Sequence, residues 1–321
     1  MRDGRSSELL MKIIHEPCEF APATEGVSLA IGMFDGVHLG HQRILAQMVK
    51  DAGQLGTISV AITFDRHPNA VVAPEQIPPL IYSLGQRLSV IGSLEVDIAW
   101  LIRFDREFSR QPGAEFIDAL VKDFGRIRSV WVGADFSFGH KRSGNVALLK
   151  ARGQHLGFSV HDVPAVSCDG EIISSTRIRG AIRTGDLESA SQMLGRPYSV
   201  LGRVLRGDQL GRELGFPTAN LDVSGLGLPP MGVYAGIVDF GGRKYQAVAN
   251  LGQRPSLDRP VGDLRFEVHL MEFEGDLYGH EIEFAFVKRL RAEEKFASLD
   301  ALKRQIEKDA AAARALLSER L

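Results

Sequence analysis

Two histidines three residues apart are the first residues of this chain whose types and spacing suggest chemistry. His38 and His41 lie in the stretch VSLAIGMFDGVHLGHQ at 27–42, together with Gly32, Gly36 and Gly40. A β-branched apolar run precedes them, which predicts a strand at Val27–Ile31 followed by a helix through Gln42–Asp51. A helix start favours an anion through its unpaired N–H groups and dipole, and glycines allow close approach. The two imidazoles could then donate hydrogen bonds to a phosphate whose charge grows in a transition state.

Other chemistries fit this stretch less well. The glycines at every fourth position do not form GxGxxG, and no GK[ST] follows, so neither a dinucleotide fingerprint nor a P-loop is present. A zinc site needs further nitrogen or sulfur ligands at short spacing, and HLGH lacks the glutamate of HExxH. A single histidine near a helix start is usually a cap or a surface residue, and this alternative stays open for the pair.

A second polar segment, ISSTRIR at 173–179, precedes another helical pattern. Hydroxyl side chains at a helix start are ordinary N-caps. Three consecutive hydroxyls, including Ser175 and Thr176, together with Arg177 and Arg179 also suit the β- and γ-phosphates of a nucleotide. The economical interpretation is one site that holds a triphosphate from two sides.

The stretch GDQLGRELGFPTANL at 207–221 is predicted to be a loop that enters a strand. Its glycines are Gly207, Gly211 and Gly215, and Pro217 blocks a helix. A plain glycine-rich hairpin loop would show the same pattern. However, Thr218 and Asn220 are oxygen-bearing side chains two positions apart, which can project the same way from extended backbone. This spacing suits Mg²⁺, which binds a few oxygen ligands together with substrate phosphates.

Glu267 is the other candidate in the second half of the chain. Leu264, Phe266 and Val268 alternate with Arg265, Glu267 and His269, so the carboxylate is predicted on the polar face of a strand. A charge on an outer face is usually only solvated. If that face lines a cleft, Glu267 could act as a general base toward an alcohol.

The elements that must position these residues fall into two patterns. Between about 27 and 163, short apolar segments alternate with helical ones, which predicts a doubly wound parallel sheet that binds ligands at the carboxyl ends of its strands. After about residue 196, apolar and polar residues alternate with a period of two, and Gly/Pro turns separate these stretches. This pattern predicts an antiparallel β-barrel or sandwich, and a helix at 299–321 is expected to cover one side of it. The expected fold is α/β, with domains at 12–187 and 196–321. Asp186 and Gly195 are expected to cap a helix at Leu187–Leu194 between them.

Composition agrees with two globular domains. The chain has 321 residues, of which 44% are hydrophobic and 24% charged, and its formal net charge is −2. No overall positive field attracts nucleic acid. Cys18 and Cys168 are far apart and form no metal or disulfide motif. Neither a membrane-spanning apolar run nor a signal peptide is recognised, so the expected location is the cytoplasm, with no membrane partner.

The first half resembles a known family. FDGVHLGH and ISSTRIR are similar to the nucleotidylyltransferase superfamily, and TFDRHP at 63–68 and GADFSFGHKRSG at 133–144 resemble the adenylyltransferase domain of bacterial FAD synthetases. The resemblance implies that FMN attacks ATP with Mg²⁺ present, and that Asp135 lines the flavin and nucleotide cleft. It also implies nucleotide contacts from Gly32, Phe34, Asp35, Gly36, Gly40, Ser175, Thr176 and Arg179. Arg66 departs from the proline that is usual in this family.

The second half resembles bacterial riboflavin kinase. The motifs GRELGFPTAN, GVYA, VANLGQRP, FEVHLMEFEGDLYG and LRAEEKF follow one another in order through residues 211–296. The resemblance implies that Thr218 and Asn220 bind Mg²⁺–ATP, that the loop with Gly207, Gly211 and Gly215 binds the nucleotide, and that Arg291 contacts flavin. Glu267 would activate the 5′-hydroxyl of riboflavin. Ser256, Leu257 and Glu272 depart from the usual pattern.

Together the two halves resemble the bifunctional riboflavin kinase/FAD synthetase family, with riboflavin, FMN and ATP as substrates. A monomer or weak homo-oligomer is expected. Two alternatives remain at this point: a chain in which only one domain is active, and a non-catalytic flavin carrier. A carrier would have no need of Glu267, ISSTRIR or the paired histidines.

Overall fold

The computed structural model describes residues 11–20, 25–206, 211, 215–254 and 263–318. The predictions that concern Gly207, Ser256 and Leu257 lie outside these residues. The chain forms two compact units. The first comprises Met1–Leu80 and Leu84–Ser175, and the second comprises Ile81–Ser83 and Thr176–Leu321. This division differs from the sequence-based limits of 12–187 and 196–321, which remain a prediction.

The first unit is built on a six-stranded parallel sheet of order β1-β4-β3-β2-β5-β8. β2 reads Val-Ser-Leu-Ala-Ile and is buried along its whole length, as expected where helices cover both faces of a parallel sheet. The strands are β1 (Lys12–Ile14), β2 (Val27–Ile31), β3 (Ile58–Phe64), β4 (Ile98–Ile102), β5 (Ile127–Gly133) and β8 (Ser159–Val163).

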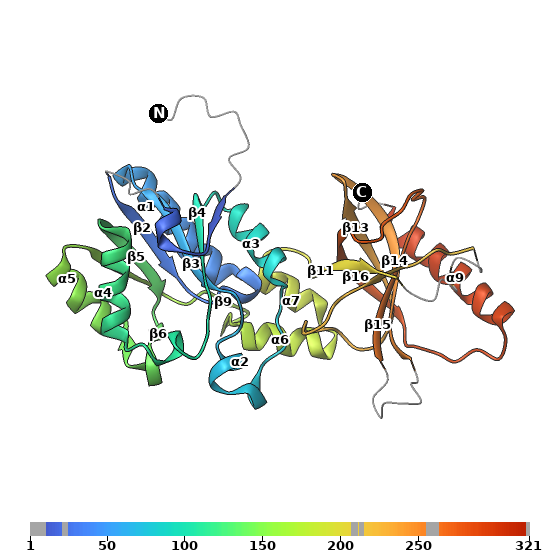
Figure 1. Cartoon of the computed structure of the whole chain (residues 1–321). Coiled ribbons are helices and arrows are strands. Elements are labelled where there is room, and N and C mark those ends of the chain that lie inside the picture. Colours follow the sequence, from blue (N-terminus) through green and yellow to red (C-terminus); the bar gives the residue numbers. More distant parts are fainter. Residues whose placement is uncertain (1–10, 21–24, 207–210, 212–214, 255–262, 319–321) are drawn as a thin grey trace. The chain divides into compact units, whose positions relative to one another are not determined.

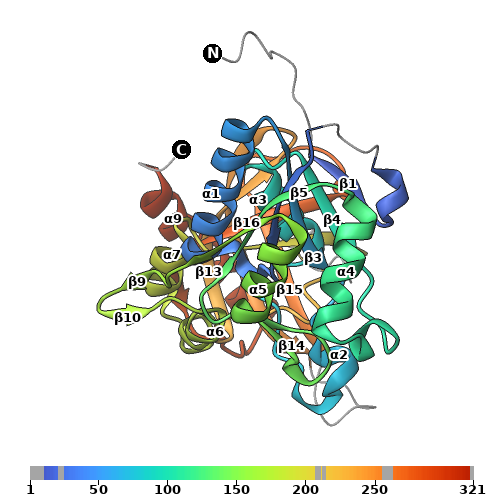
Figure 2. The same ribbon diagram turned by 90° about the vertical axis from the view of Figure 1, so that its left-hand side faces the viewer.

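Helices cover both faces of this sheet. The side chains of Val27, Leu29 and Ile31 join a core with α4 (Gly113–Phe124) and α5 (Val146–Leu156). On the other face, Ala30 joins a core with α1 (Leu39–Leu55) and α3 (Leu84–Gly92). Figures 1 and 2 show α4 and α5 together on one side of the strands. The predicted doubly wound α/β fold of the first half is therefore confirmed.

The order of the strands indicates where the first unit is expected to bind a ligand. The chain passes from β2 outward to β3 and β4, and then returns to the other side of β2 to form β5. The order therefore reverses between β2 and β5. In doubly wound sheets, ligands bind beyond the carboxyl ends of the strands at such a point. The turn after β2, which leads to His38, begins there.

Short elements complete the first unit. They are η1 (Pro17–Glu19), η2 (Asp35–Val37), α2 (Asn69–Val72), η3 (Pro74–Gln76), η4 (Phe108–Arg110), β6 (Ser137–Phe138), η5 (His140–Arg142), β7 (Gly144–Asn145), β9 (Ser167–Cys168) and β10 (Glu171–Ile172).

The second unit contains a closed antiparallel barrel of order β11-β12-β15-β14-β13-β16. Its interior is filled by alternate residues such as Phe266, Val268 and Phe284, each at most 1% exposed. Gly241 and Gly242, both with positive φ, make the tight turn between β13 and β14. The strands are β11 (Ser199–Leu205), β12 (Ala219–Leu221), β13 (Gly232–Phe240), β14 (Arg243–Arg254), β15 (Asp263–Leu270) and β16 (Glu281–Arg291).

Helices that accompany the barrel include α6 (Ser175–Thr184), α7 (Leu187–Leu194) and α9 (Leu299–Leu317). α7 has the predicted limits, because the Asp186 side chain accepts the Ser189 N–H and Gly195 ends the helix in the left-handed region. α9 packs through Ala310, Ala313 and Leu317 on the outside of β13 and β14, as Figure 1 shows. The predicted antiparallel barrel with a final helix is confirmed.

Some predicted boundaries were wrong. The helix expected at Gln42–Asp51 begins at Leu39, so His41 lies within it rather than before it. Leu264, expected on the apolar face of its strand, is 45% exposed. Within the described ranges, no helix combines the length and the apolar character that crossing a membrane requires.

Candidate functional site

The turn after β2 has a backbone that side chains rarely adopt. Phe34 has φ 51° and Val37 has φ 38°, and Gly36 between them has φ 73°. A β-branched residue with positive φ is strained and persists only where its surroundings hold it. Such strain is concentrated at functional sites. This turn ends at His38, the residue that precedes the first turn of α1.

His38 and His41 form a stacked pair. Their ring centroids are 3.7 Å apart with an interplanar angle of 20°, and the Phe34 ring meets His41 edge-on at 5.4 Å. A Cβ on Gly40 would lie 3.1 Å from the His38 ring, so glycine leaves the space that this ring occupies. The spacing that the sequence suggested therefore brings both imidazoles together at the start of α1.

Burial decides the charge of His41. Burial lowers the pKa of His41 well below its usual 6.5, and the neighbouring His38 and Arg87 lower it further. His41 is therefore neutral at pH 7, and its buried Nδ1 makes no hydrogen bond within the described residues. A neutral imidazole still carries one N–H donor.

Several hydrogen bonds hold the strained turn. The Met33 carbonyl accepts the Thr63 hydroxyl at 3.0 Å and Arg87 Nη1 at 3.1 Å. Gln42 Nε2 donates to the Val37 carbonyl at 2.8 Å, and the Ser175 hydroxyl donates to the Asp35 carbonyl at 3.2 Å. These bonds come from four different elements, which explains how the turn keeps its conformation.

The remaining first-half candidates lie on three segments. Asp135 is exposed and lies in the turn directly after β5, at the carboxyl edge of the sheet. β5 is the strand that pairs with β2. Ser175 reaches the strained turn, as described. Thr176 and Arg179 follow it on α6 and belong to the second unit, so their role beside the histidines remains a prediction. Gly32 and Asp35 lie in the turn itself.

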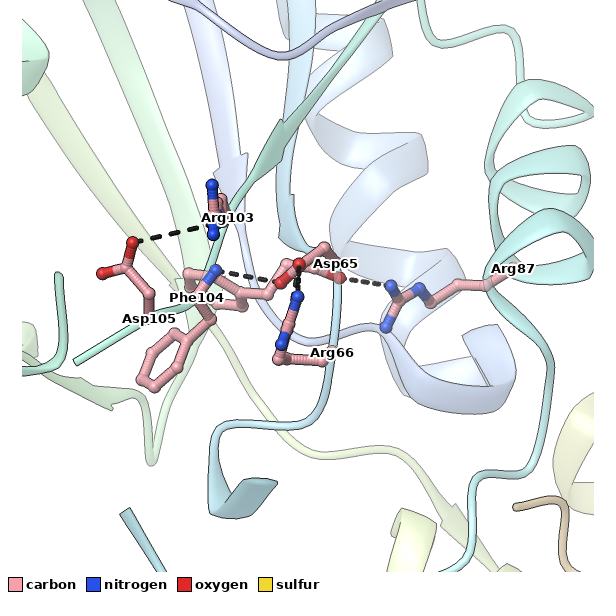
Figure 3. A network of polar contacts seen from close by, with 7 residues as sticks. Asp65, Arg66, Arg87, Arg103, Phe104 and Asp105 are labelled. Atoms are coloured by element: carbon pink, nitrogen blue, oxygen red, sulfur yellow. Dashed lines mark hydrogen bonds and ion pairs between the residues drawn. The ribbon is translucent and has the colours of Figure 1, made fainter. Parts of the chain in front are cut away.

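The carboxyl ends of β3 and β4 add polar groups, which include Asp65 and Arg66 of the motif TFDRHP. Asp65 accepts the Phe104 N–H at 2.9 Å and Arg66 Nη2 at 2.7 Å, as Figure 3 shows. Partial burial alone would raise the pKa of Asp65, but these two bonds outweigh it and lower the pKa below its usual value. Arg66 is half exposed at the same edge as the turn.

A cluster of neighbouring aromatic rings begins at this edge of the sheet. Neighbouring ring centroids are 5.2–5.9 Å apart, in edge-to-face, tilted and stacked contacts. The cluster extends from the end of β3 to the segment that follows Asp135. Its members are Phe64, Phe104, Phe108, Phe116, Phe138 and Phe136. Sequence reasoning missed this cluster because its members are distributed over 75 positions of the chain.

In the second unit, strand pairing places Glu267 in a polar row on the outside of the barrel. Asn220 on β12 and Asn250 on β14 are the direct neighbours of Glu267 on either side. Directly opposed residues have Cβ atoms about 5 Å apart. The Glu267 side chain is 31% exposed, and Arg265 Nη1 lies 3.6 Å from its carboxylate. Glu267 is thus neither buried nor isolated.

The glycine-rich segment packs against the start of β12. The Phe216 N–H donates to the Gly211 carbonyl at 2.7 Å, and a Cβ on Gly211 would lie 3.1 Å from the Thr218 hydroxyl. Gly215 adopts φ 89°. Thr218 also lines a cavity of about 430 Å³, whose walls include Pro217, Val268, Phe273 and Tyr278. The backbone here approaches Thr218 more closely than a side chain would allow.

Arg291 lies in the same cross-strand row as Glu267, separated from it by Asn250 and Val233. Its Nη2 donates to Asp309 Oδ2 of α9 at 2.8 Å, and its Nη1 donates to the Ala292 carbonyl at 3.0 Å. The two side chains of the pair are only 17% and 6% exposed. In this conformation Arg291 anchors α9, so its predicted flavin contact remains a prediction.

Two family models match the chain, one for each half. The model described as FAD synthetase matches residues 21–177, and the model described as riboflavin kinase matches residues 194–317. The first range contains His38, His41, Asp135 and Ser175. The second contains Thr218, Asn220, Glu267 and Arg291.

Similar proteins contain both halves. A bifunctional riboflavin kinase/FMN adenylyltransferase of Pseudomonas fluorescens is 38% identical over 95% of this chain and 98% of that protein. The protein of the same description from Haemophilus influenzae is 38% identical over 92% of this chain and 95% of its own length. A solved Streptococcus pneumoniae structure, described as a macrolide-efflux protein, has a TM-score of 0.79 and 29% identity over 95% of this chain and 99% of its own. The chain therefore belongs to the bifunctional riboflavin kinase/FMN adenylyltransferase family, and it forms FMN from riboflavin and FAD from FMN.

Proposed function

We propose that the turn at 32–41 is the adenylyl-transfer site and that the row through Glu267 is the phosphorylation site. The stacked imidazole pair at the strand-order reversal, with His38 buried and His41 partly buried, is the observation that carries the first assignment. The pair lies at a helix start, at the position where phosphates are expected in such a sheet, and each imidazole can supply an N–H donor there. The second assignment rests on the alignment of Asn220, Glu267 and Asn250 beside the glycine-rich segment.

In the adenylyl-transfer step, a phosphate oxygen of FMN attacks the α-phosphorus of ATP. The new O–P bond forms while the bond from the α-phosphorus to the bridging oxygen breaks, and pyrophosphate leaves. His38 and His41 donate hydrogen bonds to phosphate oxygens as charge accumulates. A neutral His41 suits this task, because it donates without exchanging a proton with the substrate. Ser175, Thr176 and Arg179 would hold the β- and γ-phosphates.

The flavin of FMN would pack on the aromatic cluster that begins at Phe64. Except for the buried Phe116, the rings of this cluster are partly buried, and the cluster begins at the same edge of the sheet as the strained turn. Offset and edge contacts between aromatic rings add about 0.5–1.5 kcal/mol each beyond the area they bury. This placement would bring the phosphate of FMN toward the start of α1.

In the phosphorylation step, Glu267 accepts the proton of the riboflavin 5′-hydroxyl while its oxygen attacks the γ-phosphorus of ATP. The bond to the β–γ bridging oxygen breaks, and ADP leaves. A carboxylate that is 31% exposed can both receive this proton and release it to water. The cavity beside Thr218 would hold the nucleotide, with Gly211 and Gly215 close to its phosphates.

Mg²⁺ is the metal that this second site fits. Thr218 and Asn220 offer two oxygen ligands, and Gly211, which has no side chain, lets the glycine-rich segment lie close to Thr218. The ion would neutralise phosphate charge during transfer. Among the described residues, no cluster of three His, Cys, Asp or Glu side chains suits a metal, which agrees with a site completed by substrate phosphates and water.

Two substitutions test the assignment. Glu267→Gln is expected to lower the rate of FMN formation about 10²- to 10⁴-fold, the usual contribution of a general base, and to leave FAD formation from supplied FMN unchanged. His38→Ala is expected to do the reverse, with a loss of about 10²- to 10³-fold. Both products are measured by chromatography of the same preparations.

The exposed carboxylate of Glu281 on β16 provides a matched control. Glu281→Gln removes a charge from the same barrel at a position outside the polar row, and both rates should stay at their original values. Equal losses of both activities in folded Glu267→Gln or His38→Ala protein would refute separate sites. The cytoplasmic location and the monomeric or weakly associating state stay predictions.

A further inference from the structure

Arg87 is a buried arginine directly behind the proposed adenylyl-transfer site. It extends from α3 and is 2% exposed. Its Nη1 donates to the Met33 carbonyl at 3.1 Å, and its Nη2 donates to the Phe64 carbonyl. Figure 3 shows the guanidinium pointing toward the chain at the end of β3. Arg87 therefore joins the ends of two central strands, β2 and β3.

The charge of Arg87 is not paired directly with a carboxylate. Within the described ranges it forms no ion pair, and its buried Nε has no hydrogen-bond acceptor. Burial lowers the pKa of Arg87 to about 10, although Asp35 and Asp65 oppose this shift. Arg87 thus remains a cation at pH 7. A buried charge that lacks a partner is costly, so its presence at this edge calls for a function.

The contacts of Arg87 lead to the histidines in three steps. Its hydrogen bond fixes the Met33 carbonyl, which Thr63 also holds. The next residue, Phe34, has the strained positive φ and places its ring against His41. His41 in turn stacks on His38. A shift of Met33 would therefore move both imidazoles.

We propose that Arg87 is a positioning residue for adenylyl transfer: it clamps the turn after β2 to the end of β3, holds the imidazole pair in place, and adds a fixed positive charge behind the phosphates. It acts through Met33 and Phe34 and, because it is buried, does not touch the substrate. The inference rests on the proposed site at His38 and His41.

The experiment compares Arg87→Met and Arg87→Lys in the full chain. Methionine keeps the apolar stem and removes every donor, whereas lysine keeps the charge and can hold only one carbonyl well. A displacement of about 1 Å in reacting groups can cost 10²-fold in rate. We expect kcat for FAD formation to fall about 100-fold in Arg87→Met and about tenfold in Arg87→Lys. KM for ATP and for FMN should stay within about threefold.

The chain supplies two internal controls. FMN formation from riboflavin in the same preparations should be unchanged, because it uses the other unit. Arg152→Met removes an arginine of the same unit that pairs with Asp118 on the surface, and it should leave both rates unchanged. Thermal unfolding followed by tryptophan fluorescence monitors the folding of this unit, because it contains both Trp100 and Trp131.

Three results would overturn the proposal. They are a kcat within threefold of the original in folded Arg87→Met, a loss that matches only the unfolded fraction of each variant, and equal losses for lysine and methionine. If Arg87→Met does not fold, the tenfold loss in Arg87→Lys decides alone. His38→Ala is measured in parallel. If His38→Ala retains full activity, the site assignment itself fails, whereas loss in His38→Ala with an active Arg87→Met refutes only the role of Arg87.

Discussion

The two proposed sites, one in each unit, would both bind ATP phosphates, but they are built from different parts of the backbone. The first uses a strained turn at the carboxyl ends of parallel strands, where His38 is 7% exposed and His41 is neutral. The second uses the outer face of antiparallel strands, where the Glu267 side chain is 31% exposed. The first site is held by hydrogen bonds to backbone carbonyls, and the second by strand register.

This difference suits the chemistry proposed for each site. Adenylyl transfer needs donors that stay in place while charge accumulates, and the stacked contact and burial at the start of α1 restrict the motion of the two rings. Phosphorylation of an alcohol needs a base that takes a proton and returns it to solvent. A strained turn therefore suits the first reaction, and a half-exposed strand face suits the second. If the two units are independent, a substitution in one unit should leave the stability and the activity of the other unchanged.

The largest expected effect concerns the buried pair Arg291–Asp309. Asp309→Ala leaves an uncompensated buried guanidinium and should lower the free energy of unfolding of the second unit by about 3–5 kcal/mol. Circular dichroism should show an earlier barrel transition, while tryptophan fluorescence, which reports only the first unit, should not change. Asp239→Ala, an exposed position on β13, is the control. A common shift of both signals would show that the units do not unfold independently.

Gly40→Ala should separate activity from stability in the first unit. The new methyl group would lie 3.1 Å from the His38 ring and displace it, which should slow FAD formation about tenfold. Alanine is the better helix former, so the thermal midpoint of the first unit should not fall. FMN formation serves as the control. Full FAD formation in this variant would mean that the His38 ring position is unimportant.

Acid should weaken the first unit through His41. The folded-state pKa of His41 lies well below 6.5, so the unfolded chain takes up the proton first as the pH falls below that value. The free energy of unfolding should therefore decrease below about pH 6.5, by at most about 1.4 kcal/mol per pH unit. Denaturant titrations followed by tryptophan fluorescence measure this slope. His41→Asn should reduce it, and an unaltered slope would contradict the assignment.

The smallest effects are expected at two helix caps, one in each unit. The Asn145 side chain accepts the Leu148 N–H of α5, and the Ser298 side chain accepts the Ala301 N–H of α9. Each alanine substitution should cost about 1 kcal/mol. Asn145→Ala should move the fluorescence transition alone, and Ser298→Ala should move only the barrel transition in circular dichroism. An effect of either substitution on both transitions would indicate coupling.

Much of the fold could be predicted because its periodicities are strong. The strand at Val27–Ile31 and the helix at Leu187–Leu194 have the predicted limits, since β-branched residues and capping residues mark them. The helix α3 was not predicted, because its nine residues carry only a short apolar pattern. Arg87 was missed together with this helix. A charged residue in a short helix is also normally expected to face water.

By itself, the sequence determined which residues could do chemistry: the paired histidines, the hydroxyl and arginine segment, and the oxygen ligands at Thr218 and Asn220. These signals are local, since helix starts and strand alternation arise within a few residues. Only the tertiary structure decided that Glu267 stands between Asn220 and Asn250, and that Arg87 supports Met33 from 54 positions away. Strand register and burial join residues that are distant in the chain, and no local pattern records which of them meet.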